Sequence, residues 1–152
     1  DNVFKDYHLY LIVVKKFHEL SIETFVQATE DGSKVMEAVN NLVGREIDDI
    51  TVLDSEGVHR NPIKILKTSF GREREIREII SSWQEMDFWK TALDKADERM
   101  DENLVYHLRV DKQSAFRNEI RLWEEGESIQ IRLKVASFPA SRERGLEVVR
   151  EL

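Results

Sequence analysis

The sequence predicts an α+β fold, a two-layer sandwich in which helices pack on one face of a mostly antiparallel sheet. The chain has 152 residues, of which 41% are hydrophobic and 35% are charged, a size and composition typical of one globular domain. Strand-like and helical patterns follow each other in the order β-α-β-β-α-α-β-β-β-α. Three strand-like runs late in the chain favour antiparallel neighbours over βαβ units.

The first half of the chain predicts three strands and one helix. Leu20, Ile22 and Val26 alternate with polar residues, which is typical of a half-buried strand starting near residue 17. Thr29 or Asp31 can cap a helix that ends at Gly44, where a left-handed C-terminal cap belongs. The next two strands are predicted over residues 46–54 and from Ile63 to about Thr68.

The second half begins with a helical stretch over residues 72–100, with a break near residues 84–87 where Asp87 could cap the second helix. Strand-like runs follow at residues 104–110, 118–124 and 128–136, and a short turn or helical segment at 111–117 joins the first two. Ser141 can cap a terminal helix.

Residues 1–16 are predicted to be an N-terminal extension, and residues 17–152 a single domain. The apolar run Leu9 to Val14 fits a buried strand, an added edge strand or part of a homodimer contact, and these alternatives stay open. It is far shorter than the roughly 18 apolar residues that a membrane span needs. The chain also lacks the basic-then-apolar order of a signal peptide, so we expect a cytoplasmic protein that does not bind membranes.

Several kinds of chemistry have no support in the sequence. The chain has no cysteine, which excludes disulfides, thiolate nucleophiles and cysteine-based metal sites. Its four histidines form no zinc-binding spacing, and no P-loop, dinucleotide fingerprint or nucleophile elbow is present. We therefore predict no metal site, no cofactor and no catalytic activity.

The late strands predict a basic face on the sheet. Successive side chains of a strand point to opposite faces, so Tyr106, Ile131 and the apolar residues at every second position from them are predicted to face the core. The opposite face then carries Arg109, Arg121, Arg132 and Lys134, together with His107 and Trp123. Cations neutralise phosphates and an exposed indole stacks on bases, so this face is a candidate RNA-binding surface. The alternative is an ordinary solvated face, because Glu119 shares it and the formal charge of the chain is −7.

The loop at residues 56–62 is a second candidate, because loops carry more than their share of functional residues. Arg60 could contact a phosphate, with His59 and Asn61 beside it. The alternative is a structural turn, since Asn61 before Pro62 is a good turn former.

The sequence resembles the archaeal RNA-binding family of predicted exosome subunits with a double-stranded-RNA-binding-domain-like fold. The resemblance covers residues 16–152 and is carried by Ala28-Thr29-Glu30-Asp31 with Lys34-Val35, by the loop from Glu56 to Ile63, and by Arg99 to Glu102 followed by Tyr106 to Ala115. It implies an α+β domain without known catalysis that takes part in archaeal RNA processing or degradation.

The motif positions of the family fall on Gly57, His59, Asn61, Pro62, Arg109, Asp111, Lys112, Gln113 and Ala115. The departures are Val58 for a usual His, Ser114 for a usual Ala, and Arg60 and Asn118 where Gly is usual. Lys112 could reach a phosphate and Gln113 a ribose hydroxyl. Equally, Asp111 could cap the turn, which would make the motif a signature of the fold.

Two functional hypotheses follow. The first is a non-catalytic RNA-binding accessory factor of the exosome that uses the basic face and Lys112-Gln113. The second is a protein-interaction module or homodimeric scaffold without direct RNA contact, which the acidic net charge favours.

Overall fold

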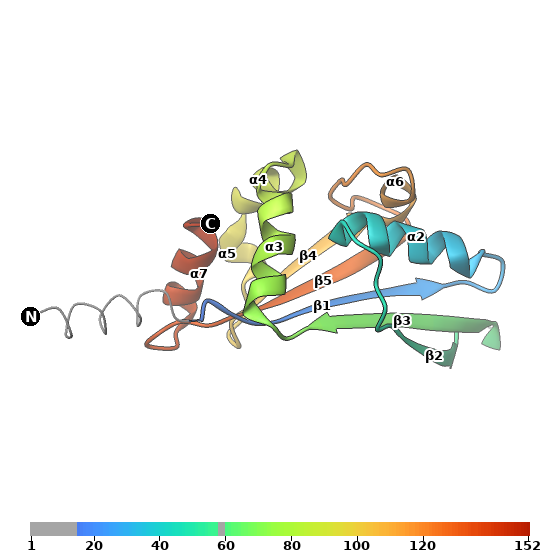
Figure 1. Cartoon of the computed structure of the whole chain (residues 1–152), viewed down its shortest axis with the longest axis horizontal. Coiled ribbons are helices and arrows are strands. Elements are labelled where there is room, and N and C mark those ends of the chain that lie inside the picture. Colours follow the sequence, from blue (N-terminus) through green and yellow to red (C-terminus); the bar gives the residue numbers. More distant parts are fainter. Residues whose placement is uncertain (1–14, 58–59) are drawn as a thin grey trace, which may run out of the picture.

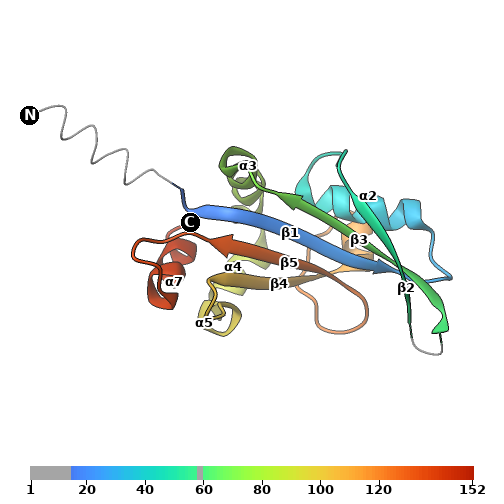
Figure 2. The ribbon, with the colours of Figure 1, turned by 90° about the horizontal axis from the view of Figure 1, so that it is seen from below.

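Helices cover one face of a five-stranded antiparallel sheet and leave the other face open (Figures 1 and 2). The computed structural model describes residues 15–57 and 60–152, and the predictions made for residues 1–14 and for His59 lie outside them. In the described part the elements are β1 Phe17–Val26, α2 Gly32–Val43, β2 Thr51–Glu56, β3 Pro62–Phe70, α3 Glu73–Gln84, α4 Asp87–Leu93, α5 Ala96–Arg99, β4 Val105–Asp111, α6 Lys112–Phe116, β5 Ser128–Val135 and α7 Arg142–Arg150.

The strands lie in the order β2-β3-β1-β5-β4, so β1 is central and β2 and β4 are the edges. All four strand pairs are antiparallel, which confirms the predicted α+β class. The register places Leu20 of β1 between Phe70 of β3 and Leu133 of β5. Apolar side chains of neighbouring strands therefore point to the same, helix-covered face.

Three of the predicted helix caps, Asp31, Gly44 and Ser141, are present. The Asp31 carboxylate accepts a hydrogen bond from the Ser33 backbone N–H at 2.9 Å, and Gly44 ends α2 with a φ of 75°. Ser141 caps α7 in the same way as Asp31 caps α2. The prediction for Asp87 was wrong, because Met86 occupies the N-cap position of α4 and makes no side-chain cap bond.

Aromatic side chains form the centre of the core between the helices and the sheet. Trp83 of α3 lies against Phe88 and Trp89 of α4, with ring centroids 5.9 and 6.0 Å apart, and Trp89 meets Tyr106 of β4 at 6.1 Å. The Trp83 indole N–H donates to the Leu42 carbonyl at 2.8 Å, which ties α3 to α2. These large buried rings hold the helical layer to the sheet.

Glu73 fixes the start of β1. Its carboxylate accepts hydrogen bonds from the backbone N–H groups of Lys16 and Phe17, both at 3.0 Å. Glu73 thereby links the first turn of α3 to the first residues of the central strand.

Two predicted strands differ from the structure. Residues 118–124 are not a strand, because they form only an isolated bridge between Leu122 and Val110. Asn118, with a φ of 60°, turns the chain after α6 and breaks the extended run. The strand predicted at 46–54 begins at Thr51 and extends to Glu56.

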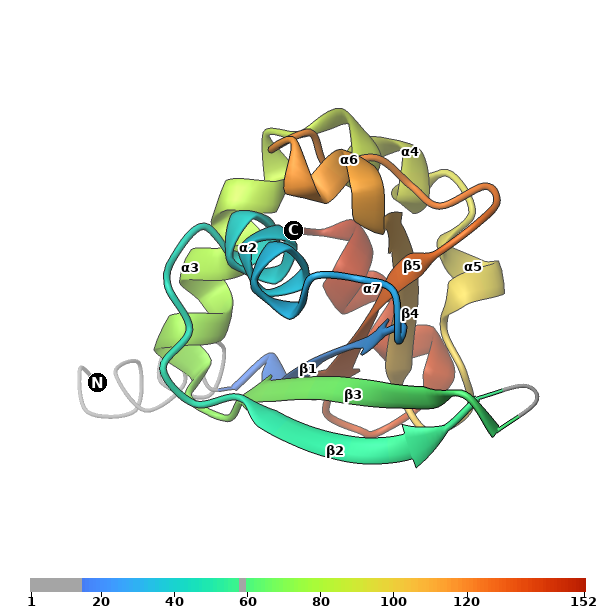
Figure 3. The ribbon, with the colours of Figure 1, turned by 90° about the vertical axis from the view of Figure 1, so that its right-hand side faces the viewer.

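Figure 3 shows α2 and α6 side by side above the sheet. The Asn41 side-chain amide of α2 donates to the Ala115 carbonyl of α6 at 2.9 Å. No helix in the described ranges is long and apolar enough to cross a membrane.

Candidate nucleic-acid interface

The open face of the sheet brings most of the predicted cations together. The register pairs His107 of β4 with Arg132 of β5, and Lys134 lies two residues further along β5, opposite Val105. Arg109 lies next along β4, opposite Gln130. The one acid at the open-facing positions of these two strands is Asp111. The face that the helices leave uncovered is therefore positively charged along β4 and β5.

Trp123 extends this surface beyond the edge strand. Its backbone N–H donates to the Arg109 carbonyl at 2.9 Å, and the Asp111 N–H donates to the Arg121 carbonyl at 2.8 Å. The Arg109 guanidinium lies 5.3 Å from the centre of the Trp123 ring, a cation–π arrangement. The indole is thus held against a cation rather than in an apolar patch, as the RNA-binding hypothesis requires.

Two of the cations already have partners. The Lys134 ammonium donates to the Asn103 carbonyl at 2.8 Å. Arg121 forms a 2.8 Å ion pair with Glu119, and both side chains are mostly exposed. An exposed pair of this kind stabilises little, so the guanidinium stays available, but its charge is offset locally. Arg132 forms no ion pair with another residue in the described ranges.

Lys112 does not belong to the accessible surface, and its assignment as an RNA-binding residue was wrong. Its side chain is buried, with 3% of its area exposed. The ammonium group donates to the Phe25 carbonyl at 2.9 Å, to Glu30 at 2.8 Å and to Glu127 at 2.6 Å. An ammonium has three donors, and these three contacts use them all. Lys112 therefore joins β1, the loop before α2 and the loop before β5.

Asp111 and Gln113 have roles that differ from that of Lys112. The Asp111 carboxylate accepts from the Ser114 N–H at 2.8 Å and caps α6, which is the structural role left open by the sequence. Gln113 is exposed at the first turn of the same short helix. Of the Lys112-Gln113 pair, only Gln113 can reach a ligand.

The loop between β2 and β3 lies at the other edge of the sheet from β4. Arg60 and Asn61 are exposed, and the Asn61 carbonyl accepts from the Gly57 N–H at 2.8 Å. Arg60 has a φ of 60°, a conformation that Gly adopts without strain. The structure does not bring these two residues to the cations of β4 and β5.

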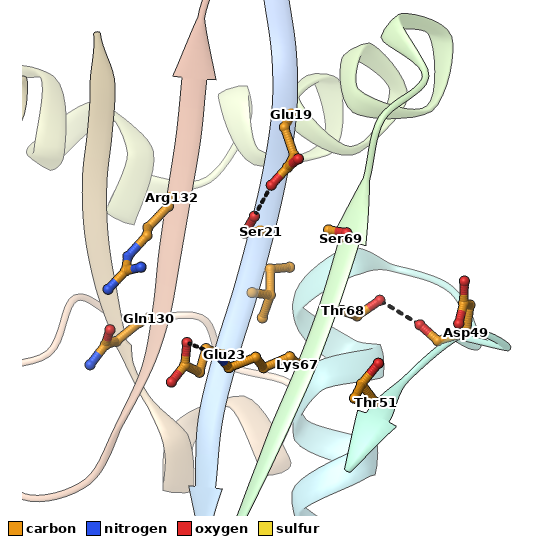
Figure 4. A pocket seen from close by; sticks show the side chains of 11 residues that line it. Glu19, Ser21, Glu23, Asp49, Thr51, Lys67, Thr68, Ser69, Gln130 and Arg132 are labelled. Atoms are coloured by element: carbon orange, nitrogen blue, oxygen red, sulfur yellow. Dashed lines mark hydrogen bonds and ion pairs between the residues drawn. The ribbon is translucent and has the colours of Figure 1, made fainter. Parts of the chain in front are cut away.

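Sequence reasoning missed Lys67 of β3 and a hollow beside it. The hollow has a volume of about 360 Å³ and lies on the open face over β1, β3 and β5 (Figure 4). Glu19 and Glu23 of β1 also line it, so acids share the centre of the face. Alternation along Ile63, Ile65, Lys67 and Ser69 was a signal that could have placed Lys67 there.

His107 is hydrogen-bonded to Asp101 at the start of the loop before β4, with 2.8 Å between Nε2 and Oδ2. Partial burial raises the pKa of Asp101, but hydrogen bonds from His107 and from the Val105 and Asn103 N–H groups outweigh it, and the net pKa lies below its ordinary value of 3.8. A lowered carboxyl pKa stabilises the fold above the ordinary value, and this contribution is lost as the pH falls through the folded-state pKa.

We therefore expect Asp101→Asn to lower the melting temperature at pH 7 because the charged partner of His107 is lost. The difference from the parent protein should shrink as the pH falls below about 4. Thermal melts of both proteins between pH 7 and pH 2 check this. A difference that stays constant over that range would contradict the role given to the Asp101 charge.

The fold and the site define a class: an α+β protein with a one-sided antiparallel sheet whose bare face carries cations and an indole. The chain belongs to the family described as RNA binding, whose model matches residues 19–135. It is 33% identical over 141 residues to RNA-binding protein PAB1135 of Pyrococcus abyssi, covering 88% of this chain and 92% of that protein.

Solved archaeal structures show the same architecture. Mth689, a DUF54 protein from Methanothermobacter thermautotrophicus, is 32% identical with a TM-score of 0.79 over 90% of this chain and 97% of its own. Protein AF2318 from Archaeoglobus fulgidus is 30% identical with a TM-score of 0.81 over 90% of this chain and 99% of its own.

Proposed function

We propose that this protein binds RNA on the open face of its sheet and acts as a non-catalytic, cytoplasmic accessory factor in archaeal RNA processing or degradation. The observation that carries the proposal is the row of cations on β4 and β5, with Trp123 at its edge, on the face that no helix covers. The family and the relative named an RNA-binding protein support the ligand class. The association with the exosome and the kinship to double-stranded-RNA-binding domains rest on sequence resemblance alone.

Charge and base stacking together favour RNA binding on the open face. Arg109, Arg132 and Lys134 can each neutralise a phosphate, and releasing the counterions of RNA makes such binding favourable at low salt. The Trp123 indole offers a stacking surface for an unpaired base, with Arg109 alongside to hold the adjoining phosphate.

Filter binding of single-stranded and structured RNA across a salt series tests the proposal. We expect binding at about 50 mM salt that weakens linearly in a log–log plot as salt rises, because phosphate contacts release counterions. Preference between the two RNA forms will show whether unpaired bases are needed. Negligible retention of both forms at the lowest salt would overturn the proposal.

One observation favours the second candidate function, a protein-interaction module or homodimeric scaffold. Val52 and Leu53 of the edge strand β2 are 50% and 43% exposed. An apolar edge strand can pair with a strand of another chain. Solution mass at increasing concentration distinguishes the two functions, since the scaffold requires association whereas RNA binding on β4 and β5 does not use β2.

A further inference from the structure

The hollow on the open face has a floor of small side chains. Ser21 of β1 and Ser69 of β3 are register partners, and both carry only a hydroxymethyl group. Longer side chains surround them: Glu19 at one end, Glu23 and Lys67 at the other, Arg132 on the β5 side and Thr51 on the β2 side (Figure 4). The volume of about 360 Å³ is in the range of sites that hold small organic ligands.

One end of the hollow pairs a hydrogen-bond acceptor with a donor. The Lys67 ammonium and the Glu23 carboxylate lie 3.8 Å apart, longer than the roughly 2.7–2.9 Å of a direct charge-assisted hydrogen bond. Figure 4 shows Lys67 reaching across β1 towards Glu23. The Glu23 side chain is 25% exposed and that of Lys67 is 48% exposed. Both groups therefore keep the capacity to bind a ligand.

The hollow itself is unsuited to phosphate. Glu19 and Glu23 both line it, and their carboxylates repel an anion. Arg132 lies on the neighbouring strand opposite Ser21, and strands are about 4.8 Å apart. Arg132 itself lines the hollow, so a phosphate held by its guanidinium would bring a nucleotide within reach of Ser21 and the rest of the floor.

We propose that the hollow is a base-reading site that accepts an unpaired guanine, an inference that rests on the proposed RNA-binding function. The Watson–Crick edge of guanine presents one acceptor, O6, followed by two adjacent donors, N1–H and the N2 amino group. Lys67 donates to O6, and Glu23, an acceptor-only group, receives the two donors. Adenine, cytosine and uracil each lack a pair of adjacent donors on this edge, so the carboxylate favours guanine.

Fluorescence anisotropy with short U-rich RNA strands that carry one central G, A or inosine tests this site. The full chain is compared with Glu23→Gln and with the control Glu56→Gln, which removes an exposed carboxylate from β2 outside the hollow. We expect the parent and the control to favour G over A about tenfold or more, the range of one good bidentate pair. The strand with inosine, which lacks the N2 amino group, should bind with an affinity between those of the G and A strands.

Glu23→Gln should lose the preference for G while it binds the A strand as well as the parent does, because removing an acid does not weaken phosphate contacts. Equal affinity of the parent for G and A, or a G preference that survives in Glu23→Gln, would overturn the base site and leave RNA binding intact. Failure of all these strands to bind at about 50 mM salt, where phosphate contacts are strongest, would overturn this site, and if structured RNA also failed to bind, the proposed function would be overturned with it.

Discussion

Replacing Arg109, Arg132 and Lys134 together with glutamine is expected to weaken RNA binding on the order of 100-fold at about 0.1 M salt. Each lost phosphate contact removes about 0.7 from the slope of log K against log salt for single strands, so the slope should fall by about 2. The three side chains lie at open-facing positions of β4 and β5, and none is buried. The variant should therefore fold as the parent does.

A matched control separates this local effect from net charge. Arg74, Lys90 and Lys95 are exposed on α3 and α4 and just after α4, in the helical layer. Changing these three to glutamine lowers the formal charge of −7 by the same three units. We expect the affinity of the control variant for RNA to fall only a few-fold, because Trp123 and the cations of the open face are unchanged. Equal losses in the two variants would show that overall charge, not the open face, governs binding.

Lys112→Met is expected to destabilise the protein by about 3–5 kcal/mol, the usual cost of removing one partner from a buried ion pair. The change leaves the Phe25 carbonyl without its donor and leaves Glu30 and Glu127 without their shared cation. Methionine has a similar length and no charge, so packing is disturbed little. Urea unfolding followed by tryptophan fluorescence measures the difference in the free energy of unfolding.

A control variant at the next residue tests whether the loss of stability is specific to the buried Lys112. Gln113→Met changes the neighbouring exposed residue of the same helix and should shift stability by less than about 0.5 kcal/mol. RNA affinity of Lys112→Met, measured where the protein is folded, should match that of the parent. A folded Lys112→Met protein with parental stability and reduced RNA affinity would restore Lys112 to the binding surface and contradict its structural role.

Local patterns were sufficient for most of the fold. Alternation placed Leu108 and Ile131 in the core, and the Asp31 and Gly44 caps marked the ends of α2, because these signals depend on neighbours in the sequence. The apparent strand at 118–124 also alternates, but its backbone pairs with β4 at a single bridge. Alternation of apolar and polar residues indicates which side chains face the core. It does not show whether the backbone of that segment pairs with another strand.

The candidate site was predicted in part for the same reason. Arg109, Arg132 and Lys134 follow from alternation once two strands are paired. The burial of Lys112 depends on Phe25 and Glu30, more than 80 residues away in the chain, and no local pattern encodes those contacts. The hollow likewise needs three strands in register around Ser21 and Ser69, which only the folded sheet reveals.

The most direct test of the account maps where RNA lies on the molecule. A single-stranded RNA carrying 4-thiouridine is bound at low salt, photo-cross-linked and digested, and the modified peptides are identified by mass spectrometry. We expect cross-links at the open-facing positions of β4 and β5 and in the segment around Trp123. Cross-links concentrated on α2, α3 or α7 would place RNA on the helical layer and contradict it.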